Sequence, residues 1–128
     1  MAILTLEVLK LDQNFNNFYY NSILISNLIE DIKTKIIYGY YGKYSPVMLT
    51  SGIASHIITN WSIENDILSC TIQTLQTPMG LILAKDIEDE IQLKVYVQSQ
   101  GREHYDDINS VHIIDSFYIL SIDLIKVE

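Results

Sequence analysis

The chain has 128 residues, of which 48% are hydrophobic and 19% are charged, and its formal net charge is −8. This composition is typical of a single folded domain with its own core, and it excludes a largely disordered chain. The acidic excess argues against a nucleic-acid partner, because phosphate binding needs clustered lysine and arginine. It suits docking on a basic protein surface.

Targeting signals are absent from the pattern of the sequence. No apolar run reaches the roughly 18 residues that cross a bilayer, so no membrane partner is expected. The first ten residues lack the basic start and the cleavage site of a signal peptide. The single cysteine, Cys70, excludes an internal disulfide and fits a reducing compartment. The sequence therefore predicts a protein that is not secreted.

The first half of the chain predicts a strand followed by a helix. Residues Ile3 to Leu11 alternate with period two and predict a strand, which a polar loop follows. Asn21 or Ser22 can cap the next helix, because short polar side chains accept hydrogen bonds from free backbone N–H groups. Its apolar stripe has spacings of three and four residues and comprises Ile25, Leu28, Ile29, Ile32 and Ile36.

A hairpin is predicted in the middle of the chain. Ile36 to Tyr41 predicts a short strand before an irregular segment bracketed by Gly39, Gly42 and Pro46. Two alternating runs then follow, Ile53 to Ile63 and Ile67 to Leu75, with a polar turn at residues 64–66. Cys70 lies on one face of the second run, between Leu68 and Ile72, where a buried and inert thiol is expected.

The last part of the chain predicts a helix and two strands. Thr77 and Pro78 form a strong helix start, because threonine caps and proline gives up an N–H that has no partner. Alternation predicts a half-buried strand from Ile91 to Val97, then a polar loop over residues 99–109, and then a strand from Val111 to Val127. Asp115 and Ser116 predict a bulge or a break in that strand. The order predicts an α+β fold of about six to seven strands and two helices.

Few residues predict chemistry. His56, His104 and His112 have no metal-ligand spacing, so no metal and no cofactor are expected. For His56 the alternatives are a satisfied imidazole in the core and a general base. Ser99, close to Gly101, is the most tempting nucleophile, although serines between strands are ordinary. The acidic residues at 86–90 lack the calcium-loop pattern and predict a solvated helix end.

Four short segments, in order, resemble those of the tailed-phage prohead proteases, the serine proteases of capsid maturation. Ser55 to Thr59 resembles the family's Ser-His-Ile-Ile-Thr strand, and Thr77 to Gly80 matches its Thr-Pro-Met-Gly helix start. Asn16 to Tyr20 resembles Asn-Gly-Arg-Val-Tyr, and Phe117 to Ile125 resembles the closing Phe-Glu-Leu-Leu-Thr-Ile-Asp-Val-Val. The resemblance implies the fold shared with herpesvirus assemblin, a mostly antiparallel β-barrel with two flanking helices.

The same resemblance implies that the family's active positions are replaced. Lys43 stands where the family has the histidine of its Gly-Glu-Leu-x-His-Pro segment, and a protonated lysine cannot accept a serine proton. Counted without gaps, Tyr96 and Val97 replace the family's two serines. A shift of two residues would place Ser99 and Gly101 on that motif, but it requires an insertion within a strand. Asp123 alone falls on an acidic position of the family.

Three functions remain open at this stage. The favoured one is a non-catalytic virion or capsid-assembly protein, located in the virion or the host cytoplasm, that binds capsid, scaffold or other virion proteins. No catalytic residues are then expected, and a homo-oligomer is compatible with the sequence. The second is an active serine prohead protease with a rearranged site of Ser99, His56 and Asp123. The third is an acidic binding or inhibitor module unrelated to capsids.

Overall fold

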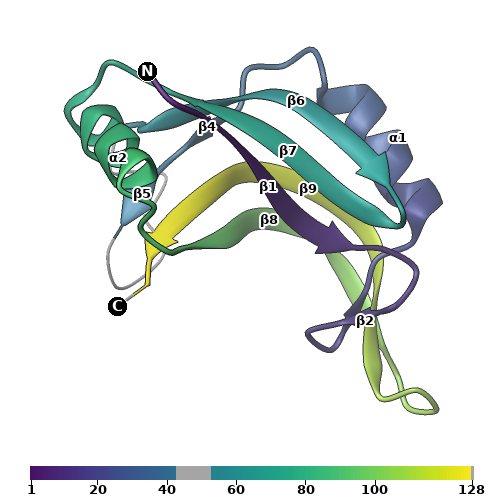
Figure 1. Cartoon of the computed structure of the whole chain (residues 1–128). Helices are drawn as coiled ribbons and strands as arrows, with labels where there is room; N and C mark the ends of the chain where they lie inside the picture. The colour runs from purple at the N-terminus through teal and green to yellow at the C-terminus, as the bar shows by residue number, and fades with distance from the viewer. Residues whose placement is uncertain (43–52, 128) are drawn as a thin grey trace.

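A computed structural model describes residues 1–42 and 53–127, and its strands form two sheets that curl around a common core (Figure 1). The first sheet is antiparallel throughout. Its strand order is β1 (Ile3–Lys10), β7 (Ile67–Thr74), β6 (His56–Glu64) and β4 (Tyr38–Gly39).

The second sheet is built around the long strand β9 (Val111–Lys126). Along its length β9 pairs antiparallel with β8 (Leu93–Asp106). On its other side it pairs in parallel with β3 (Phe18–Tyr19) at one end and with β5 (Tyr41–Gly42) at the other, while β2 (Asn14–Phe15) pairs with β3. The prediction of an α+β fold with mostly antiparallel, barrel-like strands is confirmed. The described residues contain nine strands, more than the six to seven predicted, because four of the nine have only two residues.

Helix α1 (Ser22–Ile32) begins at its predicted cap, Asn21, whose side-chain oxygen accepts hydrogen bonds from the N–H groups of residues 23 and 24. Ile25, Leu28 and Ile32 are buried, as the stripe predicted. The assignment of Ile36 to that stripe is wrong, because the helix ends before it and its side chain is 72% exposed.

The predicted short strand at 36–41 is two separate strands. Tyr38 and Gly39 pair with β6 in the first sheet, whereas Tyr41 and Gly42 pair with β9 in the second sheet. The chain therefore crosses from one sheet to the other at Tyr40. Its N–H donates to Asp123 and its carbonyl accepts from the N–H of Leu124 at 2.9 Å.

The hairpin of β6 and β7 has the predicted turn. Asn65 and Asp66 have φ values of 52° and 60°, and asparagine and aspartate tolerate this left-handed region better than most residues. Beyond the turn, burial alternates along β7, so that Leu68, Cys70 and Ile72 face the core. Cys70 is a buried free thiol whose pKa is raised to about 12 by burial, which makes it inert.

Helix α2 (Pro78–Glu88) begins where the sequence predicted. The hydroxyl oxygen of Thr77 accepts from the N–H of Gly80 at 3.0 Å and donates to the carbonyl of Ala54 at 2.6 Å. The hydroxyl of Tyr41 donates to Asp86 at 2.6 Å and attaches the helix to β5. Neither α1 nor α2 is long enough, or apolar enough, to span a membrane.

Strand β8 corrects one prediction. We expected a polar loop over residues 99–109, but β8 continues to Asp106 and only a short turn remains. The distal half of the β8–β9 ribbon projects from the two sheets (Figure 1), and residues 99–105 are exposed. Because this half of β8 is exposed, it lacks the hydrophobic alternation that identifies a strand in a sequence. Its pairing with β9 nevertheless keeps it a strand. The predicted irregularity at Asp115 and Ser116 is confirmed as a register shift opposite residues 102 and 103.

Candidate functional site

The buried histidine His56 joins the two sheets. It lies on β6 with 0% exposure, and its Nε2 is 2.7 Å from the carbonyl oxygen of Ile122 on β9. A carbonyl oxygen can only accept, so Nε2 carries the proton and Nδ1 accepts from the hydroxyl of Ser55, also at 2.7 Å. Gly39 permits this contact, because a Cβ there would lie 1.9 Å from Nε2.

Both ring nitrogens of His56 are therefore occupied in the described structure. Burial lowers the pKa of His56 to about 4, although the hydrogen bond to Ile122 acts in the opposite direction. A histidine with this pKa is neutral near pH 7, and it is a much weaker base than an ordinary imidazole. The reading of His56 as a satisfied core imidazole agrees with this geometry.

Asp123 is the buried acidic residue next to Ile122. One carboxylate oxygen accepts from the backbone N–H of Tyr40 at 3.1 Å, and the other accepts from the side-chain amide of Gln98. The side chain is 0% exposed, and burial raises its pKa, while the hydrogen bonds from Gln98 and Tyr40 act in the opposite direction. Asp123 thus fastens β8 and the crossing at Tyr40 to β9.

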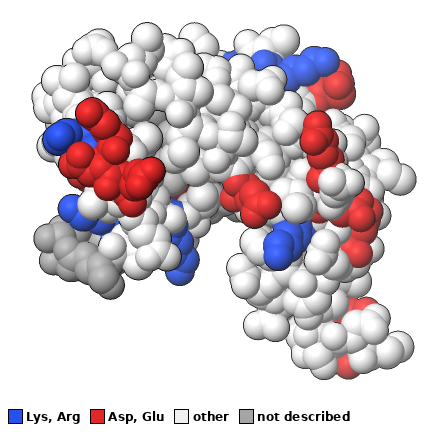
Figure 2. Space-filling model, viewed as in Figure 1, with Lys and Arg blue, Asp and Glu red and all other residues white. Residues whose placement is uncertain are grey.

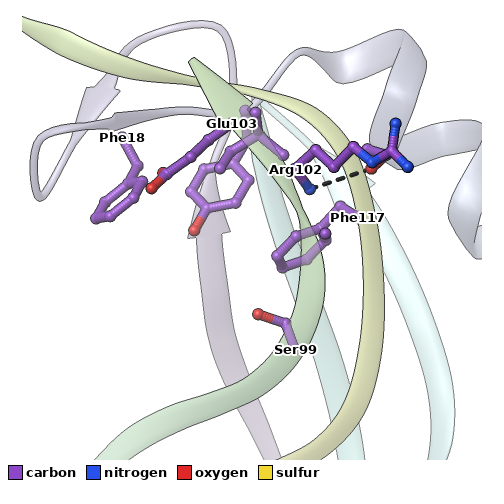
Figure 3. A pocket seen from close by; sticks show the side chains of 9 residues that line it. Phe18, Ser99, Arg102, Glu103 and Phe117 are labelled. Atoms are coloured by element: carbon purple, nitrogen blue, oxygen red, sulfur yellow. Dashed lines mark hydrogen bonds between the residues drawn. The ribbon is translucent and has the colours of Figure 1, made fainter. Parts of the chain in front are cut away.

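Ser99 lies in a different environment. It is exposed on β8 and lines a cleft of about 250 Å³ together with residues of β3 and β9 (Figure 3). In Figure 3 the hydroxyl lies below the ring of Phe117. Neither His56 nor Asp123 lines this cleft.

The three residues of the rearranged protease site are held by separate sets of contacts. Among the hydrogen bonds of residues 1–42 and 53–127, none joins Ser99 to His56 or to Asp123. The hydroxyl that contacts His56 belongs to Ser55, which is itself 0% exposed. A peptide carbonyl cannot reach a hydroxyl that solvent does not reach, so this pair cannot attack a substrate in this conformation.

Of the positions that the resemblance assigns to replaced active residues of the family, the structure describes the two on β8. Lys43 falls outside the described residues. Tyr96 is 42% exposed on β8, and Val97 is half-buried against the core. Both line a second cleft of about 280 Å³, which borders β1 and the hairpin of β2 and β3.

The remaining polar candidates have ordinary surface environments. His104 lies 2.8 Å from Asp115, and His112 lies 3.7 Å from Glu103. In the described part of the chain no three residues of the types His, Cys, Asp and Glu converge as metal ligands would. In the acidic run, Glu88 is exposed, and Lys85 pairs with Asp89 at 3.3 Å.

Comparison with known proteins identifies the fold. The chain resembles the structure described as the bacteriophage T4 capsid assembly protease, gp21, with a TM-score of 0.80 and 14% sequence identity. The likeness covers 96% of this chain and 80% of the gp21 chain. No family model and no curated protein matches the sequence. The prediction of a prohead-protease-like fold is confirmed, and at this identity the likeness concerns the fold alone.

Proposed function

We propose that the protein is a non-catalytic component of a phage virion or of capsid assembly, and that it acts by binding other proteins. The fold supports the phage context, because gp21 is a capsid assembly protease with the same architecture. The observation that carries the non-catalytic part is the hydrogen bonding of His56. Both of its ring nitrogens are bonded inside the core, one of them to a main-chain carbonyl.

A serine protease needs a base that can take the proton of an accessible nucleophile. His56 cannot take a proton from Ser99 without giving up its bond to Ser55, and turning its ring would break the bond to Ile122 as well. Ser99 is exposed, but in the described residues no hydrogen bond joins it to His56 or to Asp123. These contacts argue against the rearranged Ser99, His56 and Asp123 site.

The charge of the surface supports binding to basic proteins. The net charge is −8, and Figure 2 shows acidic side chains in several separate groups on the face drawn, one of them over the end of α2. The proposed partners are capsid, scaffold or other virion proteins, and the proposed location is the virion or the host cytoplasm. A binding module unrelated to capsids would use the same charge, so the experiment must separate the two.

The first test is a proteolysis assay. The purified chain is incubated with the phage's capsid and scaffold proteins, and fragments are identified by mass spectrometry beside a Ser99→Ala control. We expect no fragments beyond those of the control. A cleavage that wild-type protein performs and Ser99→Ala abolishes would overturn the proposal.

The second test is mass spectrometry of purified virions and proheads. A constant copy number in washed particles is the expected result. Absence from both particles, together with co-purification from infected cells with one non-structural basic protein, would instead establish the unrelated binding module.

A further inference from the structure

The cleft that contains Ser99 has walls of a particular kind. Three aromatic rings surround it, from Phe18 on β3, Tyr20 just after it and Phe117 on β9. The rings of Phe18 and Tyr20 have centroids 6.5 Å apart, and those of Tyr20 and Phe117 are 5.2 Å apart in an edge-to-face arrangement. Figure 3 shows the rings of Phe18 and Phe117 among the side chains that line this hollow.

One charged group reaches into this hollow. Glu103 extends from β8 toward Phe18, whereas the guanidinium of Arg102 points away from both of them (Figure 3). The charge of Glu103 acts on Tyr20, whose pKa is raised mainly by burial and further by this carboxylate. The carboxylate of Glu103 lies 3.7 Å from Nδ1 of His112, whose ring also stacks on Phe18. The side chain of Glu103 is 43% exposed, so a ligand can reach it.

From this geometry we infer that the cleft binds a basic side chain, preferably arginine, presented by a partner protein. Aromatic faces attract cations, and the planar guanidinium both stacks on rings and pairs with a carboxylate. The hydroxyl of Ser99 adds an acceptor on the opposite side. A volume of about 250 Å³ holds one side chain and falls below the pockets of about 300–1,000 Å³ that take small-molecule ligands.

The identity of the partner rests on the proposed function, but the chemistry of the cleft does not. A capsid or scaffold protein that presents an arginine would dock on the ribbon of β8 and β9, where it projects from the sheets (Figure 1). The net negative charge of the chain attracts basic partners, and the carboxylate of Glu103 in the cleft adds specificity for a cationic side chain.

The experiment is a titration followed by amide chemical shifts of the isotope-labelled full chain. The probes are N-acetyl-arginine amide and, as the uncharged match, N-acetyl-norleucine amide. We expect a saturable millimolar interaction of the arginine probe that shifts the amides of Phe18, Gly101 and Glu103, and at least fivefold weaker binding of the norleucine probe. Equal shifts with both probes, or shifts that map away from the cleft, would overturn the inference.

Two matched variants test the role of the carboxylate. Glu103→Gln keeps the shape of the side chain and should weaken the arginine probe at least fivefold. Glu88→Gln removes the same charge from α2, outside the cleft, and should leave binding unchanged. Thermal melts check that both variants fold. Unchanged binding in Glu103→Gln would contradict the inference.

The outcomes also separate this inference from the proposed function. If the arginine probe fails to bind while the chain is present in purified particles, the cleft inference is wrong and the proposed function stands. If the probe binds and the chain is absent from particles, the cleft is real and the virion role is wrong.

Discussion

At the scale of single residues, the environment of His56 decides how this histidine is interpreted. A histidine next to a serine on a strand can belong to a catalytic pair or can make a structural contact in the core. The sequence is the same in both cases. The difference lies in what the second nitrogen bonds. Here it donates to the carbonyl of Ile122 in the other sheet, and that contact requires Gly39. The histidine is thus a structural cross-connection that a hydrophobic side chain could not make.

Burial of His56 predicts a pH dependence of stability. The folded-state pKa of about 4 is below the ordinary value of 6.5, so between these values the unfolded chain binds a proton that the folded chain does not. The free energy of unfolding should therefore fall as the pH decreases through this window. Between pH 7 and pH 5 this group alone accounts for about 2 kcal/mol.

Urea unfolding at several pH values measures this effect, with His56→Gln as the comparison. The variant lacks the titrating ring but keeps an amide that can donate to Ile122. It should be less stable at pH 7 and should lose about 2 kcal/mol less than wild type between pH 7 and pH 5. Parallel stability curves for the two proteins would show that His56 is not the group responsible.

At the scale of elements, the start of α2 is the most strongly specified point of the chain. Thr77→Ala should lower the free energy of unfolding by about 1 kcal/mol, because Gly80 loses its cap acceptor. The bond from Thr77 to the carbonyl of Ala54 is lost as well. Thr77→Ser keeps the hydroxyl and serves as the matched control. Urea unfolding should place the serine variant close to wild type, and equal losses in both variants would contradict the capping role.

Elements with regular burial could be predicted from sequence, and elements without it could not. The period-two pattern identified β1, β6, β7 and the first half of β8, since each has one face in the core. The distal half of β8 was missed because both of its faces are exposed. The two-residue strands β4 and β5 read as one strand, since nothing in Tyr38 to Gly42 announces that the chain changes sheets at Tyr40.

The candidate site could be predicted from the sequence only in part. The sequence indicates Ser99 as a candidate nucleophile, but it does not predict the aromatic cleft around this residue. Phe117 is far in the chain from Phe18 and Tyr20, and the parallel pairing of β3 with β9 brings it next to them. Glu103 lay in the supposed loop, where one acidic residue has no distinguishing pattern. The aromatic run at residues 18–20 before α1 was the available signal.

At the scale of the whole molecule, the two sheets are held together by specific contacts as well as by the core. His56 bonds to Ile122, and Asp123 and Leu124 bond to the backbone of Tyr40 at the crossing. Apolar residues of both sheets also share one buried cluster, among them Leu68, Ile72 and Ile122. A core shared in this way should make the chain unfold as one domain.

Two probes test that prediction, one local to the first sheet and one that reports on both sheets. Trp61, the single tryptophan, lies on β6 and packs against the core, so its fluorescence reports on the first sheet. Far-UV circular dichroism reports on both sheets. For a single domain of this length the two urea transitions should coincide, with the same midpoint and the same slope.

Hydrogen exchange and the order of the urea transitions test the coupling of the sheets directly. The amide of Leu124 in β9 should exchange with the same free energy of opening as the most protected amides of β7. If Trp61 changes at a lower urea concentration than the dichroism does, the first sheet unfolds alone. In that case the contacts of His56 and Asp123 do not couple the sheets.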